Sequence, residues 1–164
     1  MAKPKVIVFG DSSRPHASEA METFIRFAQN RIEIISNYLE SGCCIEDLRK
    51  ADYAVVFGGD GTILGAAREL CQTRVPVIGV NVGKLGFLAE FSIQELEHQF
   101  ERIFFSDPLI EKRMIVHCTV RRKNRQVFSS TAVNDVVITA GAPFNMVEMK
   151  LSVEQQQLAV SIGD

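Results

Sequence analysis

The stretch Tyr53-Ala54-Val55-Val56-Phe57-Gly58-Gly59-Asp60-Gly61-Thr62 decides the fold of this chain. Its first half is an apolar run of strand length, and the residues that follow it, from Ile63 to Cys71, have the composition and spacing of a helix. A glycine turn between a buried strand and a helix lets backbone N–H groups approach a phosphate, because glycine has no Cβ and can reach positive φ angles. The stretch therefore predicts an α/β unit with a ligand site in this turn.

Asp60 is the acidic residue of this turn. It would lie at the carboxyl end of a parallel strand, which is the edge where open α/β sheets bind ligands. A simpler alternative is that Asp60 caps the helix by accepting its first N–H groups. Three glycines around one acid favour a functional carboxylate, with a phosphate loop formed by Gly58, Gly59 and Thr62.

Composition limits the classes of protein to consider. A chain of 164 residues suits one domain, or one domain and part of another, and its 46% apolar content excludes disorder. The net charge of −2 gives no electrostatic reason to expect nucleic-acid or membrane-surface binding. No apolar run is long enough to cross a bilayer, and Met1–Lys5 leads directly into a strand, so we expect a cytoplasmic protein with no membrane partner.

Cysteine and histidine give no indication of a metal site. The four cysteines lack metal-ligand spacing and are expected to be reduced thiols. The three histidines are scattered along the chain. The residues concerned are Cys43, Cys44, Cys71, Cys118, His16, His98 and His117.

The segments around the central stretch extend the α/β pattern. Apolar strands are expected at 5–9, 32–35, 53–57 and 75–80, with helical segments between them, which indicates parallel βαβ units. Ser18 is the expected cap of the first helix. One continuous helix is expected over 93–104, before Asp107-Pro108 breaks the chain.

Beyond Pro108 the pattern changes to short runs rich in β-branched residues, at 114–120, 126–130, 132–139, 146–153 and 158–162. The basic run 121–125 separates the first two and is expected to form a hairpin tip, a nucleic-acid patch being the alternative. We therefore expect a Rossmann-like parallel α/β domain over 1–108, followed over 109–164 by the start of an all-β, β-sandwich-like domain.

A second glycine-bearing loop, Asn81 to Leu88, follows the strand that ends at Val80. It would lie at the same sheet edge as Asp60, so the two loops can line one cleft. Asn81, Gly83 and Gly86 are expected to support the site, while Lys84 is either a phosphate contact or an ordinary surface lysine. Phe87 is a candidate for stacking on a purine base, the alternative being a core position.

Asn134-Asp135 lies within the strongly apolar run 132–139. Asn and Asp are depleted in strands, and a buried carboxylate without a partner is costly. Contacts with the hydroxyls and amines of a ligand would explain the pair. An edge strand or a bulge with ordinary solvent contact is the alternative.

These motifs, together with Glu111-Lys112-Arg113-Met114, resemble in the same order the successive motifs of the bacterial NAD kinases. The resemblance implies an active site between the two domains, with phosphoryl transfer from ATP or inorganic polyphosphate to the 2′-hydroxyl of the NAD adenosine ribose, giving NADP. It assigns the catalytic carboxylate to Asp60 and ligand contacts to Gly61, Asn134, Asp135 and Asp164. Because a ribose hydroxyl is a poor nucleophile, a carboxylate that accepts its proton suits this chemistry.

The resemblance also implies Mg²⁺, or another divalent cation, held mainly by the donor phosphates, and a homo-oligomeric complete protein. Two positions depart from the family pattern. Thr139-Ala140 stands where members often carry His-Arg, and the NAD-binding candidate Asn145 stands where they carry a basic or imidazole side chain. The chain also ends before the family's glycine- and threonine-rich motif, so we expect an incomplete second domain, weak NAD binding and little turnover.

Two other functions remain open at this point. Diacylglycerol-type lipid kinases and 6-phosphofructokinases share the Gly-Gly-Asp-Gly signature, but they match neither the loop from Asn81 to Leu88 nor Asn134-Asp135. An inactive nucleotide-binding fragment is the second alternative.

Overall fold

The computed structural model describes residues 2–10, 14–38, 48–83, 86–106, 108, 110–142 and 146–163. Its first part contains a four-stranded parallel sheet with the strand order β2-β1-β3-β4. The strands are β1 (Lys5–Gly10), β2 (Glu33–Tyr38), β3 (Tyr53–Phe57) and β4 (Val77–Val80). All four expected strands are confirmed, with boundaries that differ by a few residues.

The helices are α1 (Pro15–Ala28), α3 (Asp60–Leu70), α4 (Ile93–His98) and α5 (Phe100–Phe105). The expected cap at Ser18 is wrong, because α1 already begins at Pro15 with Arg14 as its N-cap. Proline is favoured at the first helical position, where its missing N–H would have no partner within the helix.

The single helix expected over 93–104 is also wrong. Gln99 leaves the helical region with φ −93° and ψ 6°, and it divides the segment into α4 and α5. Both short helices still bury their apolar sides, since Leu96, Phe100 and Phe104 are almost inaccessible to solvent. The apolar spacing that suggested one helix is therefore preserved across the break.

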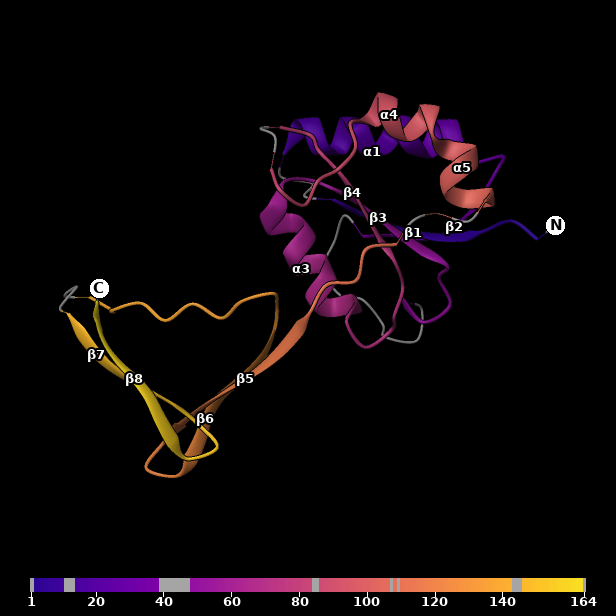
Figure 1. The fold of residues 1–164 in the computed structure, drawn as a ribbon. Coiled ribbons are helices and arrows are strands. Elements are labelled where there is room, and N and C mark those ends of the chain that lie inside the picture. The colour runs from indigo at the N-terminus through magenta and orange to yellow at the C-terminus, as the bar shows by residue number, and fades with distance from the viewer. Residues whose placement is uncertain are drawn as a thin grey trace.

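Helices cover both faces of the sheet. Figure 1 shows α1, α4 and α5 on one face and α3 on the other. Side chains alternate between the two faces along each strand, so Val8 packs on the α1 side and Ile7 on the α3 side. The central strands are therefore apolar on both faces, from Val6 to Phe9 in β1 and along the whole of β3, and they form the middle of the core.

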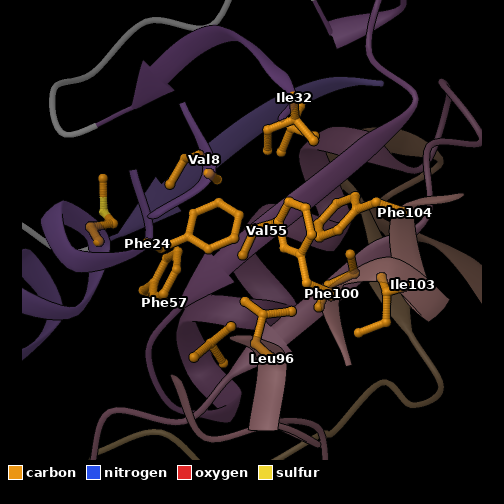
Figure 2. Packing of buried hydrophobic residues seen from close by; sticks show 14 residues of the cluster. Val8, Phe24, Ile32, Val55, Phe57, Leu96, Phe100, Ile103 and Phe104 are labelled. Atoms are coloured by element: carbon orange, nitrogen blue, oxygen red, sulfur yellow. The ribbon is translucent and has the colours of Figure 1, made fainter. Parts of the chain in front are cut away.

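An aromatic cluster fills the space between the sheet and α1, α4 and α5 (Figure 2). The Phe24 ring lies 5.6 Å from that of Phe57 and 6.4 Å from that of Phe100, and Phe100 lies 4.7 Å from Phe104. These centroid separations suit tilted aromatic pairs, which add to the stabilisation from burial alone. Rings from the two helices α1 and α5 and from the strand β3 thus pack in one cluster.

Arg31 ties the turn after α1 to α5. Its guanidinium carbon lies 5.0 Å from the centroid of the Phe27 ring and 4.1 Å from that of Phe100. The same side chain forms an ion pair with Glu101. A planar guanidinium can make both types of contact at once, so Arg31 joins the two ends of this layer.

The second part of the chain consists of two antiparallel hairpins, β5 (Ile115–Arg122) with β6 (Arg125–Val133), and β7 (Val147–Val153) with β8 (Gln156–Gly163). Both are closed by two-residue turns with positive φ, one of them at Lys123 and Asn124 with φ of 47° and 62°. The expected hairpin tip in the basic run is thus confirmed. The strand expected over 132–139 is wrong, because β6 ends at Val133.

The hairpins differ from the α/β part in burial. Among the described residues from 110 to 163, none is buried, and large side chains such as Val127 and Leu158 are more than half exposed. The α/β part meets β6 along α3, where the Arg68 side chain donates to the Ser130 hydroxyl over 3.4 Å. In the part of the chain that the structure describes, no helix has the length and apolar character to cross a membrane.

Candidate functional site

The ligand edge of the sheet lies at the carboxyl ends of β1 and β3. The chain proceeds outward from β1 to β2 on one side and from β3 to β4 on the other. Such a reversal of strand order leaves a crevice at the carboxyl ends of the two central strands. Gly58 to Asp60 follow β3 directly, and Asn81 follows β4, so both predicted loops lie at this edge. The Gly58 N–H donates to the Val80 carbonyl over 3.0 Å, which holds the loop starts side by side.

Asp60 is the first residue of α3, and Gly59 is the N-cap. The Asp60 carboxylate does not cap its own helix. Instead, Oδ2 accepts the Phe87 N–H over 2.9 Å, and Oδ1 accepts the Leu88 N–H over 3.0 Å. The two predicted loops are therefore joined through this carboxylate.

These bonds set the charge state of Asp60. The Phe87 and Leu88 N–H groups lower the pKa of Asp60 below its usual value, with a smaller contribution from the Ala89 N–H, and partial burial opposes them. A donor that binds the ionised form stabilises it, and the positive end of the α3 dipole acts in the same direction. Asp60 therefore carries a negative charge at neutral pH.

The glycines in the two loops matter for the room that their missing side chains leave. An unusual backbone angle is not the reason, because none of them has φ in the left-handed region. A Cβ at Gly86 would lie 2.6 Å from Cγ of Asp60, and one at Gly58 would lie 2.6 Å from Cβ of Thr62. A Cβ at Gly59 or Gly61 would meet nothing within 4 Å. The first pair allows tight packing, and the second leaves open the approach to the N-terminus of α3.

Phe87 extends into solvent with 95% of its surface exposed, so the alternative of a core position is wrong. Leu88 beside it packs against the core on the α3 side of the sheet. The Asn81 side chain is used within its own loop, where Oδ1 accepts the Gly83 N–H over 3.0 Å. Asn81 and Gly83 thus support the loop, while Phe87 presents a free aromatic face.

Asn134 and Asp135 do not lie inside a strand. Asn134 has a φ of 66°, a left-handed conformation that asparagine tolerates, and its N–H donates to the Met114 carbonyl over 2.9 Å. Asp135 comes after the end of β6 and is exposed. The inference from a buried carboxylate is therefore wrong. Among the described residues, neither side chain forms a hydrogen bond or an ion pair with Asp60.

Three candidates, Lys84, Asn145 and Asp164, lie outside the described residues. Within the described part of the chain, no group of three or more His, Cys, Asp or Glu side chains could hold a metal ion. His117 instead hydrogen-bonds across the β5–β6 hairpin to the Ser129 hydroxyl over 2.9 Å.

The sequence pattern missed the attachment of Asp60 to the second loop. Backbone N–H groups occur at every residue except proline, so Phe87 and Leu88 carry no mark as donors. Gly86 was the available signal, since a glycine next to an expected site can mark a close approach of another group.

A parallel sheet with reversed strand order, a glycine turn and a carboxylate at its ligand edge places the chain among the Rossmann-like α/β proteins. Comparison with known families is more specific. The model of the ATP-NAD kinase N-terminal domain matches residues 6–107, which is more than half of the chain. The chain belongs to the NAD kinase family.

Individual relatives support this assignment. The NAD kinase of Magnetococcus marinus is 38% identical over 121 residues, which cover 73% of this chain and 40% of the relative. That of Desulforamulus reducens is 31% identical over 159 residues, covering 92% of this chain and 55% of the relative. The chain thus spans about half the length of the curated relatives that it matches.

A solved structure, yeast NADH kinase complexed with NADH, has the same fold over 98% of this chain and 55% of its own, with a TM-score of 0.82 and 20% identity. This similarity confirms the expected arrangement of a parallel α/β domain followed by a β-rich part.

Proposed function

We propose that this chain forms the α/β half, and part of the β half, of an NAD kinase. The reaction transfers the terminal phosphoryl group of ATP, or of inorganic polyphosphate, to the 2′-hydroxyl of the NAD adenosine ribose and yields NADP. The observation that carries the proposal is the ionised Asp60 carboxylate, which lies at the edge of the sheet where the strand order reverses. Both relatives described above are NAD kinases, which supports NAD as the substrate.

Asp60 would act on the attacking hydroxyl. A carboxylate offers about four acceptor positions, of which the Phe87 and Leu88 N–H groups occupy two. The remaining positions can accept a hydrogen bond from the ribose hydroxyl and then its proton. Because the pKa of Asp60 is lowered, the carboxylate is a weak base, and its main contribution is to orient the nucleophile.

The phosphates of the donor would approach the N-terminus of α3. The open space at Gly59 and Gly61 leaves room for them beside the Asp60 and Gly61 N–H groups, which precede the first bonds of the helix, those from Thr62 and Ile63 to the Gly59 carbonyl. Mg²⁺ would enter as part of the donor, bound to its phosphates, since the described residues offer no cluster of three ligands.

The adenine base of NAD would lie against Phe87, whose exposed ring is free to stack. Asn134 and Asp135 would supply polar contacts to the adenosine. Gly61 would lie against the diphosphate. We further propose that the complete enzyme is cytoplasmic and homo-oligomeric, in line with the family resemblance.

The test is formation of NADP from NAD, ATP and Mg²⁺, followed with an NADP-specific dehydrogenase. It is run on the 164-residue chain and on the same chain extended by the remainder of the Desulforamulus reducens relative. We expect activity in the extended chain, little in the short one, and none toward diacylglycerol or fructose 6-phosphate. A comparable rate with either of those acceptors would contradict the assignment.

Asp60→Asn should lower the turnover of the active form about 10²- to 10⁴-fold, because the uncharged amide replaces one acceptor oxygen with a donor, so it neither orients the ribose hydroxyl as the carboxylate does nor accepts its proton. Asp52→Asn is the matched control. That carboxylate lies before β3, at the opposite end of the strand, and accepts the Lys5 N–H. Near-normal turnover in a folded Asp60→Asn protein would remove Asp60 from the mechanism.

A further inference from the structure

The Asp60 carboxylate also fixes a segment of the second loop, residues 86–89. It does so through the backbone N–H groups of Phe87 and Leu88, 27 and 28 positions further along the chain. The Phe87 ring cannot be held by packing, because 95% of its surface is exposed. The hydrogen bond at its own backbone N–H is therefore the anchor nearest to the ring.

Gly86 makes this anchor possible. A Cβ at this position would lie 2.6 Å from Cγ and 2.8 Å from Oδ2 of Asp60, closer than real Cβ atoms come to other groups. The carboxyl group cannot turn away from such a methyl group and keep both N–H bonds. A side chain at residue 86 would therefore displace Asp60 or the segment.

Gly79 in β4 also lies close to this segment. A Cβ there would lie 2.8 Å from the Leu88 carbonyl oxygen and 3.2 Å from Cα of Ala89. Residues 86–89 thus pack directly against the sheet edge and against the Asp60 carboxylate. Within this segment, only the Phe87 side chain extends into solvent.

We propose that Gly86 is a positioning residue for the nucleotide. By admitting the Asp60 carboxylate against residues 86–89, it holds the Phe87 ring in the orientation in which a purine base can stack on it. Asp60 then has two tasks, binding the segment and orienting the ribose hydroxyl. The stacking part rests on the proposed function, whereas the anchoring part does not.

The anchor is tested without nucleotide, on the 164-residue chain, by NMR hydrogen exchange and pH titration of the Phe87 and Leu88 amides. In the unmodified chain both amides should be protected from hydrogen exchange, and their chemical shifts should change as Asp60 titrates. Gly86→Ala should remove both effects. Gly65→Ala, the same change on α3 where a Cβ meets nothing within 4 Å, should leave them intact.

Retention of both effects in Gly86→Ala would overturn the proposed role of Gly86. If Gly86→Ala does not fold, Asp60→Asn decides the question instead. Asparagine keeps one acceptor oxygen and replaces the other with a donor, so at least one of the two amides should lose protection. Full protection of both in that variant would equally overturn the proposal.

The positioning role is tested by NAD affinity, measured by calorimetry on the same variants of the extended chain used for the activity test. Phe87→Ala should weaken binding about 5- to 100-fold, the range of lost base–aromatic stacking. Gly86→Ala should weaken it to a similar extent, and the double variant no further, because Gly86 acts through Phe87. Additive losses would contradict this route. No NAD binding in the unmodified extended chain would reject the nucleotide role and the proposed function, while the amide measurements would still decide the anchor.

Discussion

The α/β part and the hairpins are both held by ordered backbone hydrogen bonds, yet they differ completely in burial. Every buried hydrophobic side chain in the described part of the chain lies between Val6 and Phe104. The hairpins β5–β6 and β7–β8 are as regularly paired as the sheet, but none of their described residues is buried. Regular pairing of strands therefore does not imply packing of their side chains. A two-stranded ribbon without a covering layer gains little from the hydrophobic effect.

Phe24→Ala should have the largest effect on the free energy of unfolding and should show that the α/β part alone depends on packing. Phe24 is fully buried between β3 and α5, and removal of such a ring costs about 3–5 kcal/mol of unfolding free energy. Phe128→Ala on β6, where 55% of the side chain is exposed, should change it by less than about 0.5 kcal/mol. Urea unfolding followed through the helical circular dichroism signal measures both. Equal losses would show that the hairpins share the core.

Ser92→Ala should have a moderate effect confined to the α/β part. Ser92 and Glu95 form a capping box at α4, with the Glu95 N–H donating to the Ser92 hydroxyl over 3.2 Å and the Ser92 N–H to Glu95 over 2.7 Å. Loss of such a cap costs about 1 kcal/mol. Ser161→Ala on the exposed strand β8 is the matched control, with no measurable change expected in the same urea experiment. A larger effect at Ser161 would mean that β8 contributes to the cooperative unit.

The smallest expected effect is a sensitivity to acid. The pKa of Asp60 is lowered mainly by the Phe87 N–H, and that of Glu95 mainly by the Ser92 N–H. Each contributes stability that is fully present above its ordinary pKa, 3.8 for Asp60 and 4.5 for Glu95, and is lost as the pH falls through the lower value of the folded state. The thermal midpoint should therefore fall as the pH is lowered past about 4.5. The double variant Asp60→Asn, Glu95→Gln should show a shallower dependence, and an unchanged slope would contradict the assignment.

The sheet and its ligand edge could be predicted because their signals are local. The apolar run of β3 and the glycines around Asp60 lie within ten residues of each other. The period of apolar residues was less informative about boundaries. It could not show the interruption at Gln99, since the buried side chains keep helical spacing across it.

Burial could not be predicted for the second part. The run around Asn134 and Asp135 reads as a buried strand, but whether a strand is covered depends on what packs on it, and the positive φ of Asn134 ends β6. The same limit applied to Phe87, whose exposure depends on the path of a whole loop. Recognition of these motifs came from their order along the chain, which does not require knowing their environment.

The contact between Arg31 and Glu101 has a consequence for the rate at which the molecule assembles. It joins positions 70 residues apart, and with the Phe100 ring it closes the helical layer that begins with α1 and ends with α5. A contact of such large sequence separation pays a high entropic cost of chain closure, so we expect it to form after the folding barrier has been crossed. Weakening this junction should then leave the folding rate nearly unchanged and make the molecule open faster.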